Sequence, residues 1–345
     1  MRAFRYTGPH TAELQEIPRP DPAAGQVLVR VGASGACHSD IGILEAPAGA
    51  FPVPLTLGHE VAGYVDTLGP GVTRWDIGEP VVVHALFGCG SCRACVVGLE
   101  NRCRVVDFDG LGLTRDGGMA DYVAVPESHL VRIGDLDLAQ AAPLADAGLT
   151  AYHAIKLCKE NLQPGAYCVV IGVGGLGHMA IQILAATSAV SIIAVDVDER
   201  ALELAGKLGA SQVVRSNADA VAHIRDIVGP APEGADVVFD FVGVTATLDI
   251  ARTVVSPGGR LALVGLGRGE LTFRPTPGNP LNPIPLETSA VVPYWGNHLD
   301  LVEVVALSQA GRIKAETQLF ALADVAQAYD QLKKGKVQGR AVMIP

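Results

Sequence analysis

The sequence predicts an α/β protein that combines a mostly β domain with a doubly wound, parallel-sheet domain. Short β-branched segments separated by Gly and Pro dominate residues 1–147, whereas apolar strands and amphipathic helices alternate beyond them. Alternation of this kind is typical of right-handed βαβ units, whose parallel sheet is covered by helices on both faces. A chain of 345 residues is long enough for two domains.

The hydrophobic pattern places the individual elements. In the first domain we expect strands at 27–31, 61–65, 81–84 and 122–125. In the second we expect strands at 168–171, 191–195, 212–214, 236–241 and 260–264, and helices at 176–187, 200–208, 221–228 and 247–255. The Pro-rich segment 274–285 is expected to be a loop. Helices at 299–310 and 325–334 and a strand at 340–344 should fold back onto the first domain, which gives domains of 1–147 with 297–345, and 148–296.

Composition excludes several classes of function. Asp and Glu (36) outnumber Lys and Arg (26), and a net charge of −10 argues against nucleic-acid binding, which needs basic patches. The uncharged segment between Glu160 and Asp196 is broken by Pro and Gly, so we expect no membrane span. The N-terminus has no apolar secretory core and the number of cysteines is odd, 7, which favours a cytoplasmic location.

Four cysteines lie close together in the segment 88–104. Cys89, Cys92, Cys95 and Cys103 have the spacing C-x2-C-x2-C-x7-C. Four thiolates make a closed tetrahedral zinc site, which stabilises a loop but leaves no position for a substrate. Disulfides fit the odd cysteine count poorly, a redox CxxC does not need four thiols, and a ferredoxin-type cluster would continue with x3-C-P. We therefore predict a structural zinc, with an iron–sulfur cluster as the alternative.

A glycine-rich loop predicts a dinucleotide site. Gly172, Gly174, Gly175, Leu176 and Gly177 belong to a G-x-G-x-x-G run that lies between an apolar strand and a helix. Such a loop lets a pyrophosphate approach the helix N-terminus, although a loop that merely packs is the alternative. Asp196 ends the next strand, where its carboxylate can accept hydrogen bonds from the ribose hydroxyls and repel a 2′-phosphate. NAD is therefore favoured over NADP, and the nearby Arg200 weakens that preference.

A second, open zinc site is predicted from three scattered residues. A catalytic zinc has three protein ligands and one vacant position. Cys37 and His59 supply two ligands, and Asp146, a carboxylate in an apolar stretch, is the candidate third. The alternative for Asp146 is that it caps the following helix. Asp40 is a candidate hydrogen-bond partner of His59, and Glu60 is a candidate to approach the metal during ligand exchange; a surface role is the alternative for both.

These motifs together resemble the zinc-dependent medium-chain alcohol dehydrogenases over essentially the whole chain. The resemblance is carried by the run Gly58-His59-Glu60, the run from Cys37 to Asp40, the four-cysteine segment, the glycine-rich loop and the late Gly339-Arg340. The run 145–154 resembles bacterial members in which Asp replaces a second Cys as zinc ligand. The resemblance implies a GroES-like, mostly β catalytic domain and a Rossmann domain, two zinc ions per chain, NAD, and a homo-oligomer with a tetramer favoured over a dimer.

The resemblance also implies roles for individual residues. Hydride would pass reversibly between an alcohol carbon and nicotinamide, with Ser39 as first proton relay. Gly42 stands where many relatives have the terminal histidine of that relay. The resemblance implies cofactor contacts for residues outside the glycine-rich loop, namely His38, Arg340, Val242, Gly265, Tyr294 and Trp295. For Arg340 the alternative is a surface charge.

Candidate pocket residues indicate the substrate class. Apolar walls imply a small apolar alcohol, ketone or aldehyde, secondary or aryl-substituted, and are assigned to Ile41, Ile43, Phe51, Phe87 and Trp295. The aromatic residues among them could equally be ordinary core. Two other functions stay open: a polyol or amino-alcohol dehydrogenase of the same superfamily, and a noncatalytic NAD-binding zinc scaffold.

Overall fold

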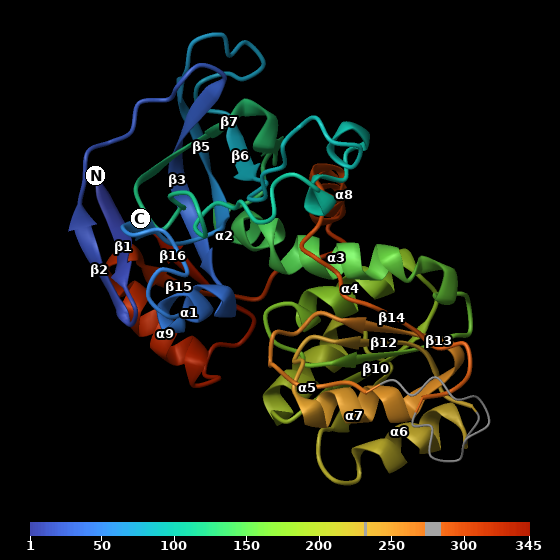
Figure 1. The fold of residues 1–345 in the computed structure, drawn as a ribbon. Coiled ribbons are helices and arrows are strands. Elements are labelled where there is room, and N and C mark those ends of the chain that lie inside the picture. The colour runs from blue at the N-terminus through green and yellow to red at the C-terminus, as the bar shows by residue number, and fades with distance from the viewer. Residues whose placement is uncertain (231–232, 273–283) are drawn as a thin grey trace. The chain divides into compact units, whose positions relative to one another are not determined.

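The computed structural model describes residues 1–230, 233–272 and 284–345, and it confirms the α/β class with a mostly β part and a doubly wound part (Figure 1). The contacts divide the chain into two compact units. Unit 1 comprises Met1–Leu149 and Trp295–Pro345, and unit 2 comprises Thr150–Tyr294. Most of the segment 274–285, predicted to be a loop, lies outside the described residues.

Unit 1 is built around β3 (Gln26–Ala36), which pairs with β5, β7 and β16, all antiparallel. Its β-branched and apolar side chains are buried, as β propensity favours. The main sheet has the order β15-β16-β3-β5-β6-β8, and a smaller sheet has the order β2-β1-β4. The other strands of the unit are β1 (Arg2–Gly8), β2 (Thr11–Glu16), β4 (Leu55–Thr56), β5 (Glu60–Leu68), β6 (Pro80–Val83), β7 (Tyr122–Pro126), β8 (Leu130–Arg132), β15 (Thr317–Ala321) and β16 (Arg340–Ile344).

Few helices accompany these strands. They are α1 (His38–Glu45), α2 (Leu138–Ala141), α8 (His298–Gln309) and α9 (Val325–Lys333), and α3 (Ala147–Leu157) begins in unit 1 and ends in unit 2. The helices predicted at 299–310 and 325–334 are therefore found within one residue at each end. The strands β1, β2, β4, β8 and β15 and the helix α1 were not predicted.

The register of three neighbouring strands decides which residues meet in unit 1. In the β16–β3 pair, Ala341 lies opposite Ala36, and in the β3–β5 pair, Gly35 lies opposite Glu60. The start of β16, the end of β3 and the start of β5 are thus adjacent. Residues that are far apart in sequence come together at this edge.

Unit 2 contains a six-stranded parallel sheet with the order β11-β10-β9-β12-β13-β14. Counted along the chain, this is the order 3-2-1-4-5-6 of the Rossmann fold. Helices α4 and α7 lie on opposite faces of the sheet (Figure 1). The elements are β9 (Tyr167–Ile171), β10 (Ser191–Asp196), β11 (Gln212–Arg215), β12 (Ala235–Asp240), β13 (Val255–Leu263), β14 (Ser289–Val291), α4 (Gly177–Thr187), α5 (Glu199–Leu208), α6 (Ala220–Val228) and α7 (Thr245–Val254).

Apolar strands form the core of unit 2. Val169, Ile193, Val238 and Leu261 belong to four adjacent strands and are fully buried, together with Ile224 of α6. The near-continuous apolar sequence of these strands reflects burial on both faces of the sheet.

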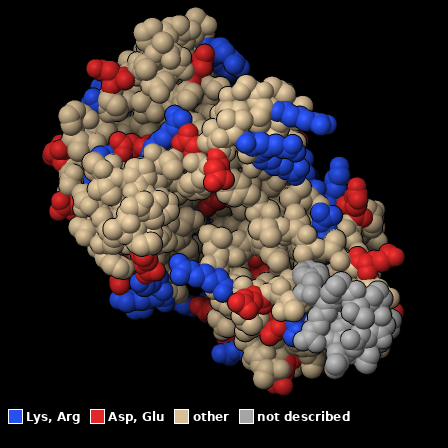
Figure 2. Space-filling view, viewed as in Figure 1, with Lys and Arg blue, Asp and Glu red and all other residues tan. Residues whose placement is uncertain are grey.

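Charged side chains lie mainly on the surface. Figure 2 shows Lys and Arg interspersed with Asp and Glu over the face that it draws. Exposed ion pairs such as Arg2–Asp121 and Arg200–Asp198, each 2.7 Å long, account for part of this pattern. Each pair of this kind contributes only about 0–1 kcal/mol to stability. No described helix has the length and the apolar character needed to cross a membrane.

Candidate active site

Three residues of unit 1 bring metal-binding atoms together. The ligand atoms of Cys37, His59 and Asp146 all lie within 4.8 Å of one another. The Sγ atom of Cys37 is 3.3 Å from the Oδ2 atom of Asp146, and the Nε2 atom of His59 is 3.4 Å from the same oxygen. All three residues are at most 9% exposed.

Each ligand is placed by the end of a structural element. Cys37 follows β3 and precedes α1, His59 immediately precedes β5, and Asp146 lies between the 3₁₀ helix η4 (Ala142–Ala145) and α3. The backbone of Asp146 is not helical, with φ −135° and ψ −63°. Its carboxylate therefore leaves the main chain at a break between two helical segments and contacts Cys37 and His59.

The arrangement fits a tetrahedral zinc. Bonds of about 2.0–2.3 Å to sulfur, nitrogen and oxygen separate tetrahedral ligands by about 3.4 Å, which is close to both measured distances. One thiolate, one imidazole and one carboxylate occupy three positions and leave a fourth for a substrate oxygen. A thiol, an imidazole and a carboxylate whose ligand atoms all lie within 4.8 Å of one another form a donor set that fits zinc.

Asp40 supports two of these ligands at once. Its Oδ2 atom accepts a hydrogen bond of 2.9 Å from the backbone N–H of Cys37, and its Oδ1 atom lies 3.4 Å from the Nδ1 atom of His59. Desolvation lowers the pKa of His59, but the Asp40 charge and hydrogen bonds to Asp146, Asp40 and Cys37 outweigh it and raise this pKa well above its usual value. Asp40 is thus in place to orient the imidazole toward a metal.

Tyr329 of α9 was not predicted from the sequence. It is 5% exposed, and its hydroxyl donates a hydrogen bond of 3.0 Å to the sulfur of Met119. Desolvation first, and then the charge of Asp40, raise the pKa of Tyr329 well above its usual value. The phenol therefore stays neutral beside Asp40. No local motif marks Tyr329, which lies 289 positions after Asp40 (329 − 40).

Glu60 and Arg340 form a buried ion pair next to the ligands. Two hydrogen bonds join them, Nε to Oε2 at 2.9 Å and Nη2 to Oε1 at 2.8 Å. Desolvation raises the pKa of Glu60 to about 6, although Arg340 acts in the opposite direction. The alternative that these two residues are surface charges is excluded, because Glu60 is 0% and Arg340 2% exposed. The predicted contacts with zinc and with pyrophosphate stay predictions.

Two further predicted residues, His38 and Ser39, directly follow Cys37 in the sequence. The hydroxyl of Ser39 is 3.5 Å from the Sγ atom of Cys37, so it lies beside the candidate metal site. His38 is exposed in unit 1, and desolvation followed by the charge of Arg340 lowers its pKa, while Asp40 raises it. Their roles as proton relay and phosphate contact stay predictions.

Trp295 packs directly against the ligand set. Its ring meets the ring of His59 edge to face, with centroids 5.4 Å apart, and its Nε1–H donates a 3.0 Å hydrogen bond to the carbonyl of Ala145. The backbone φ of Trp295 is +49°. The indole of Trp295 thus contacts the ligand His59 and also Ala145, the residue that precedes the ligand Asp146.

The other predicted pocket residues have varied surroundings. Ile41 is 9% and Ile43 1% exposed, and Phe51 is half-buried. Phe87 packs on the ring of His129, with centroids 4.4 Å apart, and under the guanidinium of Arg115. Their contact with a substrate stays a prediction.

The four cysteines of segment 88–104 also converge. The ligand sulfurs lie within 4.8 Å of one another, with 3.6 Å between Cys92 and Cys95 and 4.0 Å between Cys89 and Cys95. All seven cysteines are free in the structure. Backbone N–H groups, first that of Arg104, lower the pKa of Cys92 to about 7, whereas desolvation raises the pKa of Cys95 to about 12.

The glycine-rich loop of unit 2 connects β9 to α4. Gly172 has φ +87°, and a Cβ atom on Gly177 would lie 1.8 Å from the carbonyl oxygen of Gly172. Only glycine fits both positions, because one needs a left-handed backbone and the other a close backbone approach. Within the loop, Gly174 is exposed and Gly175 and Leu176 are half-buried, next to the first turn of α4.

Asp196 binds the glycine-rich loop. Its Oδ2 atom accepts a 2.7 Å hydrogen bond from the N–H of Val173, and its Oδ1 atom accepts a 2.9 Å bond from the N–H of Asp198. Arg200 is 2.7 Å from Asp198, so its charge is already paired. The carboxylate of Asp196 therefore stands at the end of β10, as a ribose contact requires, and ribose binding itself stays a prediction.

Val242 and Gly265 meet Gly172 at the carboxyl ends of β9, β12 and β13. A Cβ atom on Gly172 would lie 2.6 Å from the Val242 side chain, and one on Gly265 would lie 2.1 Å from the Val242 backbone. Asp240, which was not predicted, is 0% exposed and accepts hydrogen bonds from the N–H groups of Val242 and Gly243. The signal in the sequence that could have identified Asp240 is an acidic residue at the end of an apolar strand. Tyr294 is 40% exposed.

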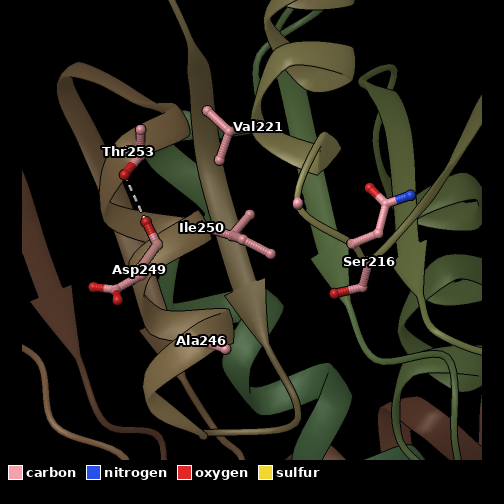
Figure 3. Close-up of a pocket in the computed structure, with 8 residues that line it drawn as sticks. Ser216, Val221, Ala246, Asp249, Ile250 and Thr253 are labelled. Atoms are coloured by element: carbon pink, nitrogen blue, oxygen red, sulfur yellow. Dashed lines mark hydrogen bonds between the residues drawn. The ribbon is translucent and has the colours of Figure 1, made fainter.

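A separate pocket lies in unit 2 between α7 and the segment 216–221 (Figure 3). Within its wall, Thr253 donates a 2.6 Å hydrogen bond to the carbonyl of Asp249. The lining residues are Ser216, Asn217, Ala218, Val221, Ala246, Asp249, Ile250 and Thr253. None of them was predicted to bind the cofactor or the substrate.

Replacement of one cysteine tests the four-thiolate site. Cys92→Ser should lower the zinc content from two ions to one per chain and lower Tm, because a closed site contributes its binding energy to folding. Alcohol oxidation per folded chain should stay near that of the wild type. Zinc analysis and thermal unfolding provide the measurement, with Val96→Ala, at a position that is 64% exposed in the same segment, as the control. A variant that keeps two zinc ions and its Tm would contradict this assignment.

Comparison with known proteins agrees with both units. Residues 23–135 match the family "Alcohol dehydrogenase GroES-like domain", and residues 175–309 match "Zinc-binding dehydrogenase". An NAD-dependent alcohol dehydrogenase of Sulfurisphaera tokodaii is 37% identical over the full length of both chains.

Two solved structures are similar over the whole chain. The alcohol dehydrogenase of Aeropyrum pernix has a TM-score of 0.90 and 34% identity, with all of both chains covered. The acetophenone reductase of Geotrichum candidum, solved in complex with NAD, has a TM-score of 0.86 and 32% identity, with 100% of this chain and 97% of that one covered. This chain therefore belongs to the zinc-binding alcohol dehydrogenase family of oxidoreductases.

Proposed function

We propose that this protein catalyses reversible, NAD-dependent hydride transfer between an apolar alcohol and the corresponding ketone or aldehyde. The observation that carries the proposal is the convergence of Cys37, His59 and Asp146, which leaves one position free on a tetrahedral zinc. The glycine-rich loop with Asp196 supports the nicotinamide cofactor. A noncatalytic scaffold would have no need of a three-ligand site.

The chain's own residues supply most of the chemistry. When bound, zinc provides the Lewis acid that polarises an alcohol or carbonyl oxygen. Cys37 and Asp146 would contribute two negative charges, and the Oδ1 atom of Asp40 lies 3.4 Å from the Nδ1 atom of His59, where it can orient the imidazole. NAD, when bound, would accept the hydride that the alcohol carbon loses, and Ser39, whose hydroxyl lies 3.5 Å from the Sγ atom of Cys37, would take up the O–H proton. Gly42 has no side chain to receive this proton, so the relay ends in water or in another group.

We propose a secondary or aryl-substituted alcohol as the substrate. The apolar candidates Ile41, Phe51 and Trp295 support this class, and Trp295 already contacts the His59 ring. The similarity to an acetophenone reductase, which by its name acts on an aryl ketone, supports it as well. Burial of apolar substrate surface against such walls would stabilise the complex by about 25 cal/mol per Å².

A substrate and cofactor screen tests the proposed activity. The zinc-loaded protein should show its highest kcat/KM with apolar secondary or aryl alcohols and NAD, measured by the absorbance of the reduced nicotinamide. Asp146→Asn should reduce turnover about a hundredfold, because a neutral amide is a poor zinc ligand, while NAD still binds. A preference for polyols or amino alcohols would overturn the substrate class. No reduction of NAD by any alcohol would overturn the activity.

Cofactor preference tests the role of Asp196. Asp196→Asn keeps an oxygen that can accept the Val173 N–H but removes the charge that repels a 2′-phosphate. The ratio of kcat/KM for NAD to that for NADP should fall about tenfold, which corresponds to about 1.4 kcal/mol. Asp249→Asn, at an exposed position on α7, is the control. An unchanged ratio in Asp196→Asn would show that another residue selects the cofactor.

We propose a homo-oligomer, with a tetramer favoured over a dimer, and a cytoplasmic location. Strand β14 is the last strand of the described sheet of unit 2, and Val292 just after it is 75% exposed. An unprotected edge of this kind invites pairing with another chain. Seven free cysteines suit a reducing compartment. Sedimentation equilibrium should give a mass of about four chains, and a monomer would refute the assembly.

A further inference from the structure

The buried guanidinium of Arg340 reaches one of the metal ligands. Its Nη2–H donates a 2.7 Å hydrogen bond to the Oδ2 atom of Asp146. This is the same oxygen that lies 3.3 Å from the sulfur of Cys37 and 3.4 Å from the Nε2 atom of His59. The oxygen that faces the candidate metal position is therefore also the oxygen that Arg340 holds.

Glu60 holds Arg340 in that position. It accepts two hydrogen bonds from the guanidinium, through Oε1 and Oε2, and its Oε1 atom also accepts a 2.9 Å bond from the backbone N–H of Ala147. Ala147 directly follows Asp146, so Glu60 fixes both the main chain next to the ligand and the cation that contacts its side chain. A fork of two parallel hydrogen bonds sets the orientation of a guanidinium more strictly than a single contact.

The sheet leaves a gap for this contact. Glu60 on β5 lies opposite Gly35 on β3, and Arg340 begins β16 on the other side of β3. The Glu60 side chain has to cross β3 to reach Arg340. A Cβ atom on Gly35 would lie 1.8 Å from the Oε2 atom of Glu60, so a glycine at this position makes the crossing possible.

We propose that Arg340 is a positioning residue for the metal site, which it serves by fixing the Oδ2 atom of Asp146 in the direction of Cys37 and His59. A carboxylate on a short side chain can present either oxygen and can rotate, whereas a thiolate ligand has one donor atom. Arg340, held by Glu60, removes that freedom, and it places a positive charge 2.7 Å from the carboxylate of Asp146. This inference rests on the metal site of the proposed function and adds Arg340 and Glu60 to it.

The first test is Arg340→Lys, which keeps the charge but lacks the planar fork that bonds Glu60 twice and Asp146 once. Zinc should leave the three-residue site about tenfold faster when a chelator is added, since residues that support ligands typically change metal affinity about 10–100-fold. The four-cysteine zinc should leave at the wild-type rate. Cobalt substituted into the three-residue site should give an altered visible spectrum. The control is Arg132→Lys, which alters the exposed pair with Glu79 on the same unit.

A double-mutant cycle separates positioning from general stability. In an Asp146→Cys background the ligand is a thiolate with a single donor atom, so there is no choice between two oxygens for Arg340 to fix. Arg340→Lys should therefore accelerate zinc release less than threefold there. Equal acceleration in both backgrounds would overturn the inference, because Arg340 would then act on the fold and not through the carboxylate. Wild-type release and an unchanged cobalt spectrum in Arg340→Lys would also overturn it.

A second variant covers the case in which Arg340→Lys does not fold. Glu60→Gln keeps the shape of the side chain and weakens its hold on Arg340, so zinc release from the three-residue site should again be faster than in the wild type; an unchanged rate would refute the inference. The zinc content of the wild type is a separate readout. One zinc per chain there would refute the proposed function itself, whereas two zinc ions with unaffected variants would refute only the role of Arg340.

Discussion

The carboxylate of Asp146 is the group on which the active-site architecture depends. Its Oδ2 atom is within 3.4 Å of Cys37 and His59 and receives a hydrogen bond from Arg340. A buried carboxylate without compensation would cost several kcal/mol. Two cations can compensate this charge. One is a metal ion, which the donor set fits, and the other is the guanidinium of Arg340. The ligand residues, the Glu60–Arg340 pair and the helical break at Asp146 all serve this one oxygen.

The strand register explains how the first and last parts of the chain share this site. β16 adds to the edge of β3 and brings Arg340 beside the end of the strand that leads to Cys37. β5 adds to the other edge and brings His59 and Glu60. Because the side chains of a strand alternate between faces, a shift of one residue in either pair would move Glu60 or Arg340 to the opposite face. Gly35 between them is accordingly a packing requirement of the metal site.

In unit 2, as in unit 1, the candidate site residues lie at the ends of strands. Here the carboxylates bond to backbone N–H groups. The 3-2-1-4-5-6 order puts the ends of β9 and β12 side by side, where Gly172, Val242 and Gly265 meet. The carboxylate of Asp196, at the end of β10, holds the turn that follows the neighbouring β9, and the carboxylate of Asp240 holds the turn that follows its own strand, β12. Open α/β sheets bind their ligands outside the carboxyl ends of the strands at such a point.

Sequence by itself determined the features whose parts are close together along the chain. The four cysteines, the glycine-rich loop with Asp196, and the alternation of strands and helices in unit 2 are local patterns, because tight turns, zinc-binding loops and βαβ units impose fixed spacings. Only the tertiary structure decided which distant residues meet. Arg340 and Glu60 are 280 positions apart, and Tyr329 carries no motif, so their contacts follow from strand register and helix packing alone. The two-residue strand β4 was missed for the same reason, since it is a strand only through its pairing with the distant β1. The hairpin of β1 and β2 is local in the sequence and was missed although its two strands are adjacent.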